Sequence, residues 1–99
     1  MVIVTGRFEL APEDRAAFIA SKEDGMRSSR AEDGCITYVF AADPIEPGLV
    51  HLYERWASRA ALDAHIAGMR SRGTPAPSPV PVLNAELLVG DVSGIRPFG

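Results

Sequence analysis

The chain has few of the residues that build a covalent or metal framework. Its 99 residues include one cysteine, Cys35, and two histidines, His51 and His65. A single cysteine cannot form an internal disulfide and cannot supply a cysteine-based zinc site. Two histidines are too few for a histidine-rich metal site, so we expect no metal. The low cysteine content also suits a reducing compartment, and we expect a cytoplasmic protein.

The sequence also lacks the usual features of membrane proteins and nucleic-acid binders. No apolar run approaches the ~20 residues that cross a bilayer, and residues 1–10 alternate instead of forming the apolar core of a signal peptide. The ten Lys and Arg residues are scattered among thirteen Asp and Glu residues, giving a net charge of −3. Nucleic-acid binders normally carry a basic excess on at least one segment. We therefore expect neither a membrane span nor a nucleic-acid partner.

What remains is the composition of one folded domain. Apolar residues make up 46% of the chain and charged residues 23%, which is typical of a globular domain of this length. No phosphate-binding glycine-rich loop and no Gly-x-Ser-x-Gly nucleophile motif occurs. We expect residues 1–99 to form a single domain.

Hydrophobic spacing and turn residues predict four strands and two helices. The strands are expected over residues 2–10, 35–42, 49–56 and 82–92, and the helices over residues 12–33 and 59–70. Pro12 suits a first helical turn, and Gly34 suits the left-handed position that ends a helix. Residues 43–48 should be the turn of an antiparallel hairpin. Residues 73–81 form a stiff Pro-rich loop, and residues 93–99 form a short tail.

This β-α-β-β-α-β order predicts a ferredoxin-like α+β fold, with a four-stranded antiparallel sheet and both helices on one face. The second face of the sheet would then be bare. Because Val and Phe recur in the strands, we expect that face to be a large apolar patch, and such patches usually mark an interface. A homodimer packed sheet against sheet follows from this pattern.

Strand alternation and helical spacing assign the notable side chains to shared faces. Ile36, Tyr38 and Phe40 should share one face of their strand. The next strand should present Val50, Leu52, Glu54 and Trp56 together. One stripe of the second helix carries Leu62, His65, Ile66 and Met69. His65 is the polar member of that stripe, and its position turns the ring toward the sheet, where Trp56 closes the preceding strand.

One stretch of the sequence carries a family pattern: Gly34-Cys35-x-x-Tyr38-x-Phe40, then Asp43-Pro44, then Glu54-x-Trp56-x-Ser58-x-x-Ala61-Leu62-x-x-His65. In order and spacing this stretch, from Glu32 to His65, resembles the antibiotic biosynthesis monooxygenase (ABM) family. The resemblance implies a dimeric α+β barrel with a pocket between each sheet and its helices. It also implies oxidation of small aromatic phenols or quinols by molecular oxygen, without metal, flavin or haem, and so no cofactor.

His65 and Trp56 are the candidate catalytic residues of such a pocket. A neutral imidazole can take a phenolic proton near neutral pH, and an indole can pack against a planar substrate and donate its N–H. Each side chain could equally serve only in the core, and Glu54 could be a structural hydrogen-bonding partner. The candidate substrate contacts are Tyr38, Phe40, Leu52, Glu54, Leu62 and Met69.

Two departures from the family pattern leave more than one function open. Leu52 stands where oxygenases of the family carry an Asn, and no second His follows His65. We expect a cofactor-independent monooxygenase that oxidises a small aromatic phenol, quinol or polyketide-like substrate with O2. The alternatives are a non-catalytic ligand-binding dimer that has lost oxygenase chemistry, and a cyclase or isomerase that does only acid–base work on a polyketide. We expect the Pro-rich loop to lie beside the pocket and limit its size.

Overall fold

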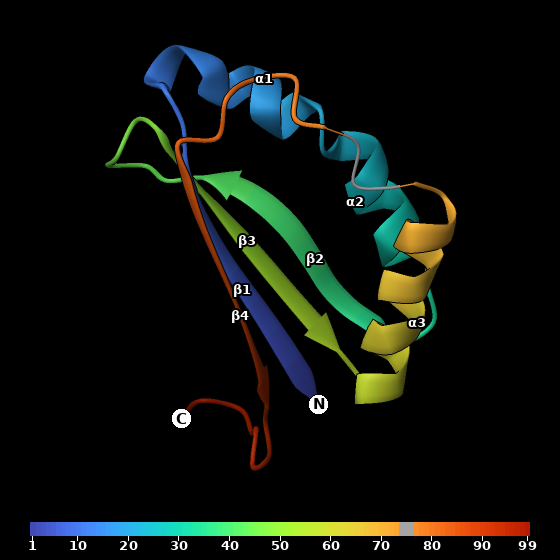
Figure 1. Ribbon diagram of the computed structural model, residues 1–99. Helices are drawn as coiled ribbons and strands as arrows, with labels where there is room; N and C mark the ends of the chain where they lie inside the picture. The colour runs from blue at the N-terminus through green and yellow to red at the C-terminus, as the bar shows by residue number, and fades with distance from the viewer. Residues whose placement is uncertain (74–76) are drawn as a thin grey trace.

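The computed structural model describes residues 1–73 and 77–99 (Figure 1). In chain order the elements are β1 (Val2–Glu9), the 3₁₀ turn η1 (Pro12–Asp14), α1 (Arg15–Ala20), α2 (Glu23–Arg30), β2 (Cys35–Ala42), β3 (Leu49–Trp56), α3 (Arg59–Ser71) and β4 (Asn84–Asp91). The four strands form one antiparallel sheet in the order β2-β3-β1-β4. This is the predicted ferredoxin-like α+β fold. In the described ranges no helix is long and apolar enough to cross a membrane.

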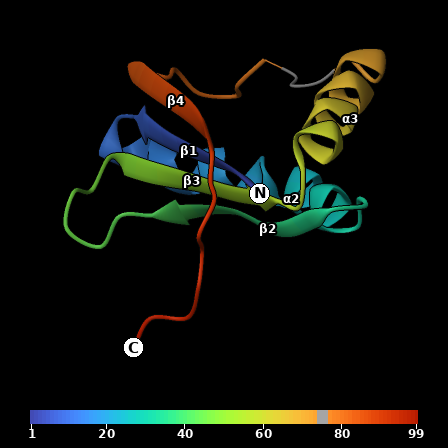
Figure 2. The same ribbon diagram turned by 90° about the horizontal axis from the view of Figure 1, so that it is seen from below.

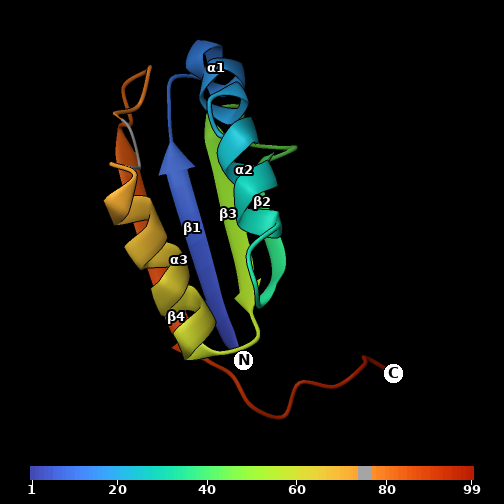
Figure 3. The same ribbon diagram turned by 90° about the vertical axis from the view of Figure 1, so that its right-hand side faces the viewer.

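The helices lie together on one face of the sheet (Figure 3). Alternate strand residues point to that face, so it collects the apolar side of each strand. Two clusters of buried residues lie there. The cluster at the Trp56 end of β3 consists of Val2, Val4, Tyr38, Leu52, Trp56 and Leu62, and we call it the first cluster. The second cluster, at the opposite end of β3, consists of Leu10, Phe18 and Val50.

The continuous helix expected over residues 12–33 is instead divided into η1, α1 and α2. Between α1 and α2 the Ser21 hydroxyl donates to the Phe18 carbonyl at 2.6 Å, and the Lys22 amide donates to Ile19, three residues back. These bonds tighten the backbone into a 3₁₀-like step. The helical part ends at Arg30, and Gly34, with φ of 82°, has the expected left-handed conformation before β2.

A β-bulge changes the side chains that β2 presents to the helices. Cys35 pairs with Trp56 and Thr37 pairs with Arg55, which leaves Ile36 as the extra residue. Ile36 is therefore 48% exposed, and the expectation that it shares a face with Tyr38 is wrong. The bulge places Cys35 on the helix-facing side instead, where it packs against the first cluster.

The sheet face without helices carries both polar and apolar side chains. On this face β1 and β3 present Ile3, Thr5, Arg7, Glu9, His51, Tyr53 and Arg55, and the outer strands add Val39 and Leu88. Most apolar residues of β1 and β3 lie on the helix side, because strand alternation sends them there together, so the bare face is mixed and not the largely apolar patch that we expected. Most large exposed apolar side chains belong to the C-terminal part of the chain: Val82, Leu83, Leu87, Leu88, Val89, Ile95 and Phe98.

The last strand, β4, is shorter than the expected 82–92 and is exposed along its whole length. Leu87 pairs with Gly6, and Val89 pairs with Val4. Gly6 and Val4 are buried on the helix side. Their partners Leu87 and Val89 are nevertheless 56% and 54% exposed. The helices therefore leave this edge of the sheet uncovered. Beyond β4 the tail runs away from the sheet (Figure 2).

Only part of the expected Pro-rich loop can be placed, because residues 74–76 lie outside the described part of the chain. Val80 packs against the second cluster, and the Leu83 amide donates to the Glu9 carbonyl at 2.8 Å. This end of the loop thus lies at the end of the sheet away from Trp56, and not beside His65 as expected.

Candidate functional site

The two candidate catalytic rings lie against each other at the end of β3. The centroids of Trp56 and His65 are 4.7 Å apart, and the ring planes meet at 37°. Trp56 ends β3, and the Ser58 hydroxyl accepts the Ala61 amide to begin α3. This tight cap turns α3 back over the strand that precedes it. Tyr38 adds a third ring, 5.5 Å from His65 and 6.5 Å from Trp56.

Gly34 determines how closely α3 approaches the start of β2. A Cβ at this position would lie 2.5 Å from the Cβ of Ala61, and φ is positive. Glycine alone meets both conditions without strain. The Gly34 carbonyl also accepts the Ala57 amide at 2.7 Å. These contacts bring the turn that contains Glu32 against α3.

Glu32, which the sequence prediction did not include in the site, is the polar partner of His65. Its Oε2 atom lies 2.7 Å from His65 Nδ1. Arg72, just after α3, places its Nη2 atom 3.8 Å from the other carboxylate oxygen. The sequence signal that could have found Glu32 is its position at the start of the family resemblance.

Glu54 is the polar partner of Trp56. The indole Nε1 donates to Glu54 Oε1 at 2.9 Å, and the two residues are 0% and 6% exposed. Burial raises the pKa of the Glu54 carboxyl, and the Trp56 hydrogen bond and the nearby His65 oppose that rise. The indole N–H is already bonded, so in this arrangement Trp56 presents its ring face and not its donor.

Two further ionisable groups at the site are held in their neutral forms. Burial, reinforced by the charge of Glu54, raises the pKa of the Tyr38 phenol to about 12. Burial, followed by the charge of Glu32, also raises the pKa of the Cys35 thiol. Neither group is therefore an anionic nucleophile near neutral pH. Within residues 1–73 and 77–99, no group of three or more His, Cys, Asp or Glu is placed to hold a metal ion.

The other predicted contact residues surround these rings. Leu52 and Leu62 belong to the first cluster, and Phe40 packs against both clusters. Met69 is half-buried one turn beyond His65 on α3. The structure thus brings the predicted residues together as one layer between sheet and helix. His65 is 5% exposed and Trp56 is fully buried, so the layer is closed over the two candidate catalytic residues.

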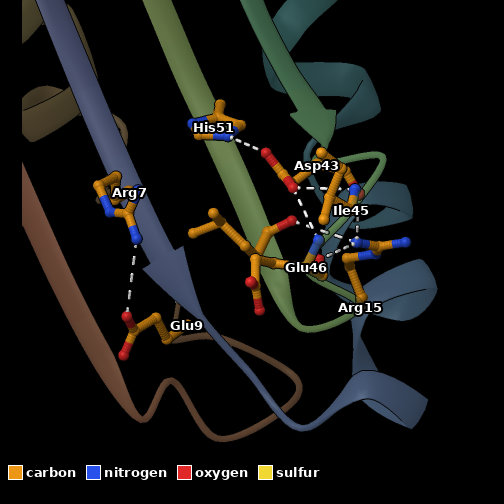
Figure 4. A network of polar contacts seen from close by, with 8 residues as sticks. Arg7, Glu9, Arg15, Asp43, Ile45, Glu46 and His51 are labelled. Carbon is orange, nitrogen blue, oxygen red and sulfur yellow. Dashed lines mark hydrogen bonds and ion pairs between the residues drawn. The ribbon is translucent and has the colours of Figure 1, made fainter.

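A second histidine–carboxylate pair lies at the turn between β2 and β3, on the face away from the helices (Figure 4). His51 Nε2 is 2.7 Å from Asp43 Oδ1. The other Asp43 oxygen accepts the backbone amides of Glu46 at 2.8 Å and Ile45 at 3.0 Å. The Glu46 amide, the His51 ring and the Ile45 amide together lower the pKa of Asp43 to about 2.

Arg15 of α1 joins this turn to the helices. Its Nη1 atom donates to the carbonyls of Asp43 at 2.9 Å, Glu46 at 2.8 Å and, more weakly, Leu49 at 3.4 Å. Beside the turn, the bare sheet face is hollowed by about 350 Å³. The hollow is lined by Thr5, Gly6, Arg7, His51, Leu52, Tyr53 and Glu86. His65 and Trp56 are not among these lining residues, so this hollow is separate from the layer that contains them.

The fold and the ring layer define a class of small α+β proteins with a histidine and aromatic side chains between the sheet and a helix. The model of the antibiotic biosynthesis monooxygenase family matches residues 1–69 of this chain. The chain belongs to that family.

Two curated relatives are similar in sequence. Protein sll1783 of Synechocystis sp. is 38% identical over 64 residues, which cover 65% of this chain and 44% of that protein. Rv0793 of Mycobacterium tuberculosis is named as a candidate monooxygenase. It is 38% identical over 74 residues, which cover 75% of this chain and 66% of that protein. The matched part of the chain thus spans less than half of the first relative and about two thirds of the second.

Solved structures share the fold over nearly the whole chain. The structure of Rv0793 from M. tuberculosis superposes with a TM-score of 0.66 at 30% identity, covering 95% of this chain and 98% of that one. The crystal structure of a candidate antibiotic biosynthesis monooxygenase from Deinococcus radiodurans gives a TM-score of 0.72 and covers 100% of both chains. At 20% identity, the second likeness is evidence of the fold alone.

Proposed function

We propose that the protein is a cofactor-independent monooxygenase that oxidises a small aromatic phenol, quinol or polyketide-like substrate with O2. The observation that carries this proposal is His65, held by Glu32 at 2.7 Å and lying beside the rings of Trp56 and Tyr38. Membership of the family, and the monooxygenase name of one relative, support the reaction class.

The chemistry asks little of the protein beyond binding, proton removal and exclusion of water. Once a phenol or quinol has lost its proton, the electron-rich anion can give an electron to O2 directly. For a benzylic CH2 group that becomes a carbonyl, one oxygen atom enters the product and the other leaves as water. The substrate supplies all the electrons, so no external reductant is needed.

Each predicted residue has a role in this scheme. His65 takes the phenolic proton, and Trp56 is the wall against which the planar substrate packs. Tyr38, Phe40, Leu52, Leu62 and Met69 line the site. Glu54 acts through Trp56, because it holds the indole N–H. Since His65 is 5% exposed, a substrate ring can bind beside it only if the side chains that cover it move.

We also infer that the active form is a homodimer. Leu87, Leu88 and Val89 of β4 are each more than half exposed, and a second copy would remove them from water. Sedimentation should give about twice the 10.6 kDa chain mass at micromolar concentration. A species of single-chain mass would contradict this inference. A cytoplasmic location remains a prediction from the single cysteine.

The function is tested by oxygen consumption of the metal-stripped protein with hydroquinones and anthrone-like phenols. His65→Gln keeps some hydrogen bonding but removes the base, and we expect turnover to fall by roughly 10²–10⁴-fold. His51→Gln is the matched control, because it makes the same change at the histidine on the other face. Thermal melting of each variant is measured alongside turnover. A loss in His65→Gln no larger than the loss of folded protein would remove His65 from the mechanism.

A second candidate function is ligand binding without turnover. It is favoured by Leu52, which is 4% exposed within the first cluster and cannot stabilise a developing oxyanion. Saturable binding of an aromatic phenol with no oxygen consumption would support this function. Product formation under anaerobic conditions would instead point to a cyclase or isomerase.

A further inference from the structure

The contact between Glu32 and His65 is specific to one ring nitrogen. Oε2 of Glu32 lies 2.7 Å from Nδ1 of His65. A neutral imidazole has one N–H donor and one bare nitrogen, and an ionised carboxylate only accepts. In this pairing Nδ1 therefore carries the hydrogen and Nε2 holds the lone pair.

The carboxylate that could compete for His65 is already committed elsewhere. Glu54 is the buried acid at the site, and it accepts the indole N–H of Trp56 at 2.9 Å. Other ionisable groups at this site in the described part of the chain include Cys35 and Tyr38 of β2, Arg30 of α2 and Arg72 beyond α3. The first two have raised pKa values, and Arg72 lies 3.8 Å from Glu32.

The position of Glu32 is itself well determined. It lies in the turn between α2 and β2, where its carbonyl accepts the Cys35 amide at 3.2 Å. Gly34, two residues later, packs closely on Ala61 of α3, since a Cβ at Gly34 would lie 2.5 Å from the Cβ of Ala61. The carboxylate is thus held against the helix that carries His65, and its second oxygen is held by Arg72.

We propose that Glu32 is the positioning residue that keeps His65 in its Nδ1–H form, so that Nε2 is the atom that accepts the substrate proton. The inference rests on the proposed function for the identity of that proton. Its structural part, the tautomer and orientation of His65, can be measured without any substrate.

The two histidines of the chain provide an internal control. His65 is bonded through Nδ1, whereas His51 is bonded through Nε2, to Asp43. Nitrogen NMR of the imidazole rings separates protonated from bare nitrogens, and it is recorded at a pH where the spectrum itself shows one N–H on each ring. We expect the wild-type protein to show Nδ1–H at His65 and Nε2–H at His51. An Nε2–H tautomer, or an equal mixture, at His65 would overturn the proposal.

Two matched variants then test the Glu32–His65 and Asp43–His51 pairs one at a time. Glu32→Gln should shift His65 toward a mixture of tautomers and leave His51 unchanged, since an amide can either donate or accept. Asp43→Asn should change His51 and leave His65 unchanged. If Glu32→Gln leaves the His65 nitrogens as in the wild type, Glu32 is not the positioning residue. Should that variant fail to fold, Glu32→Asp replaces it in the same comparison, and an Nε2–H tautomer in the wild type would still overturn the proposal.

Kinetics test the link to turnover separately. On a substrate that the wild type oxidises, Glu32→Gln should lower kcat at least tenfold, though by no more than His65→Gln, with little change in KM. Restoration of kcat by Glu32→Asp would show that a carboxylate is what His65 needs. An active wild-type enzyme with the wrong tautomer refutes this inference alone. The expected tautomer in a protein that consumes no oxygen refutes the proposed function alone.

Discussion

The imidazole of His65 and the indole of Trp56 face each other at 4.7 Å, and each ring turns its polar edge to a different carboxylate. The indole N–H is bonded to Glu54, and the imidazole Nδ1 to Glu32. Glu54 is buried on the sheet, and burial raises its pKa. Glu32 is reached by Arg72 at the margin of the site. The two neighbouring rings thus have different carboxylate partners: Trp56 is bonded to a buried acid of raised pKa, and His65 to an acid that lies near Arg72.

Replacement of Gly34 by alanine should destabilise the protein. The positive φ strains any other residue, and the new Cβ would meet Ala61 at 2.5 Å. We expect a loss of about 1–3 kcal/mol in the free energy of unfolding, measured by urea denaturation. Gly25→Ala is the matched control. Nothing lies within 4 Å of its added Cβ, so this change inside α2 should stabilise by roughly 0.5–1 kcal/mol. Equal effects of the two changes would contradict the role given to Gly34.

Glu54→Gln should remove a pH-dependent loss of stability. Burial raises the folded-state pKa of Glu54, so folding favours its protonated form. In the wild type this contribution is fully present below the unfolded pKa of about 4.3 and is lost as pH rises through the folded value. Relative to Glu54→Gln, the wild type should therefore become less stable from about pH 4 upward. Denaturation of both proteins at several pH values measures this difference, and a constant difference would show that Glu54 is not shifted.

Asp43→Asn should show the opposite pH dependence. The Glu46 amide, the His51 ring and the Ile45 amide lower the pKa of Asp43 to about 2. A lowered pKa stabilises the fold above the unfolded value, and that stabilisation is lost as pH falls toward 2. The wild type should thus be more stable than Asp43→Asn near neutral pH, and the two should converge in acid. Thermal melts of both proteins between pH 2 and 6 measure this. A difference in Tm that persists in acid would show that the turn depends on the shape of the Asp43 side chain and not on its charge.

Arg15→Met should weaken the attachment of the β2–β3 turn to α1. The guanidinium donates to the carbonyls of Asp43 and Glu46 at 2.9 and 2.8 Å. Losing these charged donors should cost about 1.5–3 kcal/mol. Arg27→Met is the control, because Arg27 makes only exposed ion pairs with Glu23 and Asp24 among the contacts described for it. Such pairs contribute about 0–1 kcal/mol. A comparable loss of unfolding free energy in both variants would show that the hydrogen bonds of Arg15 do not stabilise the fold.

The sequence alone was sufficient for the elements whose patterns are local. Alternating strands, the Ser58 cap and the left-handed conformation of Gly34 each depend on a few neighbouring residues, and the structure contains all of them. The stripe on α3 and the alternation of β3 also predicted that His65 and Trp56 would face each other. These periodicities state which side of an element is apolar, and that side must meet the core.

Contacts between residues distant in sequence could not be predicted from such local patterns. The pairing of Glu32 with His65 depends on how a turn packs against α3, and the bulge at Ile36 depends on strand register. The mixed character of the bare face likewise depends on which side chains all four strands place there together, Ile3 and Leu88 among them.

The sequence by itself thus determined the order of elements, the fold class and the rings that meet at the site. Only the tertiary structure decided which carboxylate serves which ring, because hydrogen bonds between distant residues follow from the packing of helix on sheet and from no spacing along the chain.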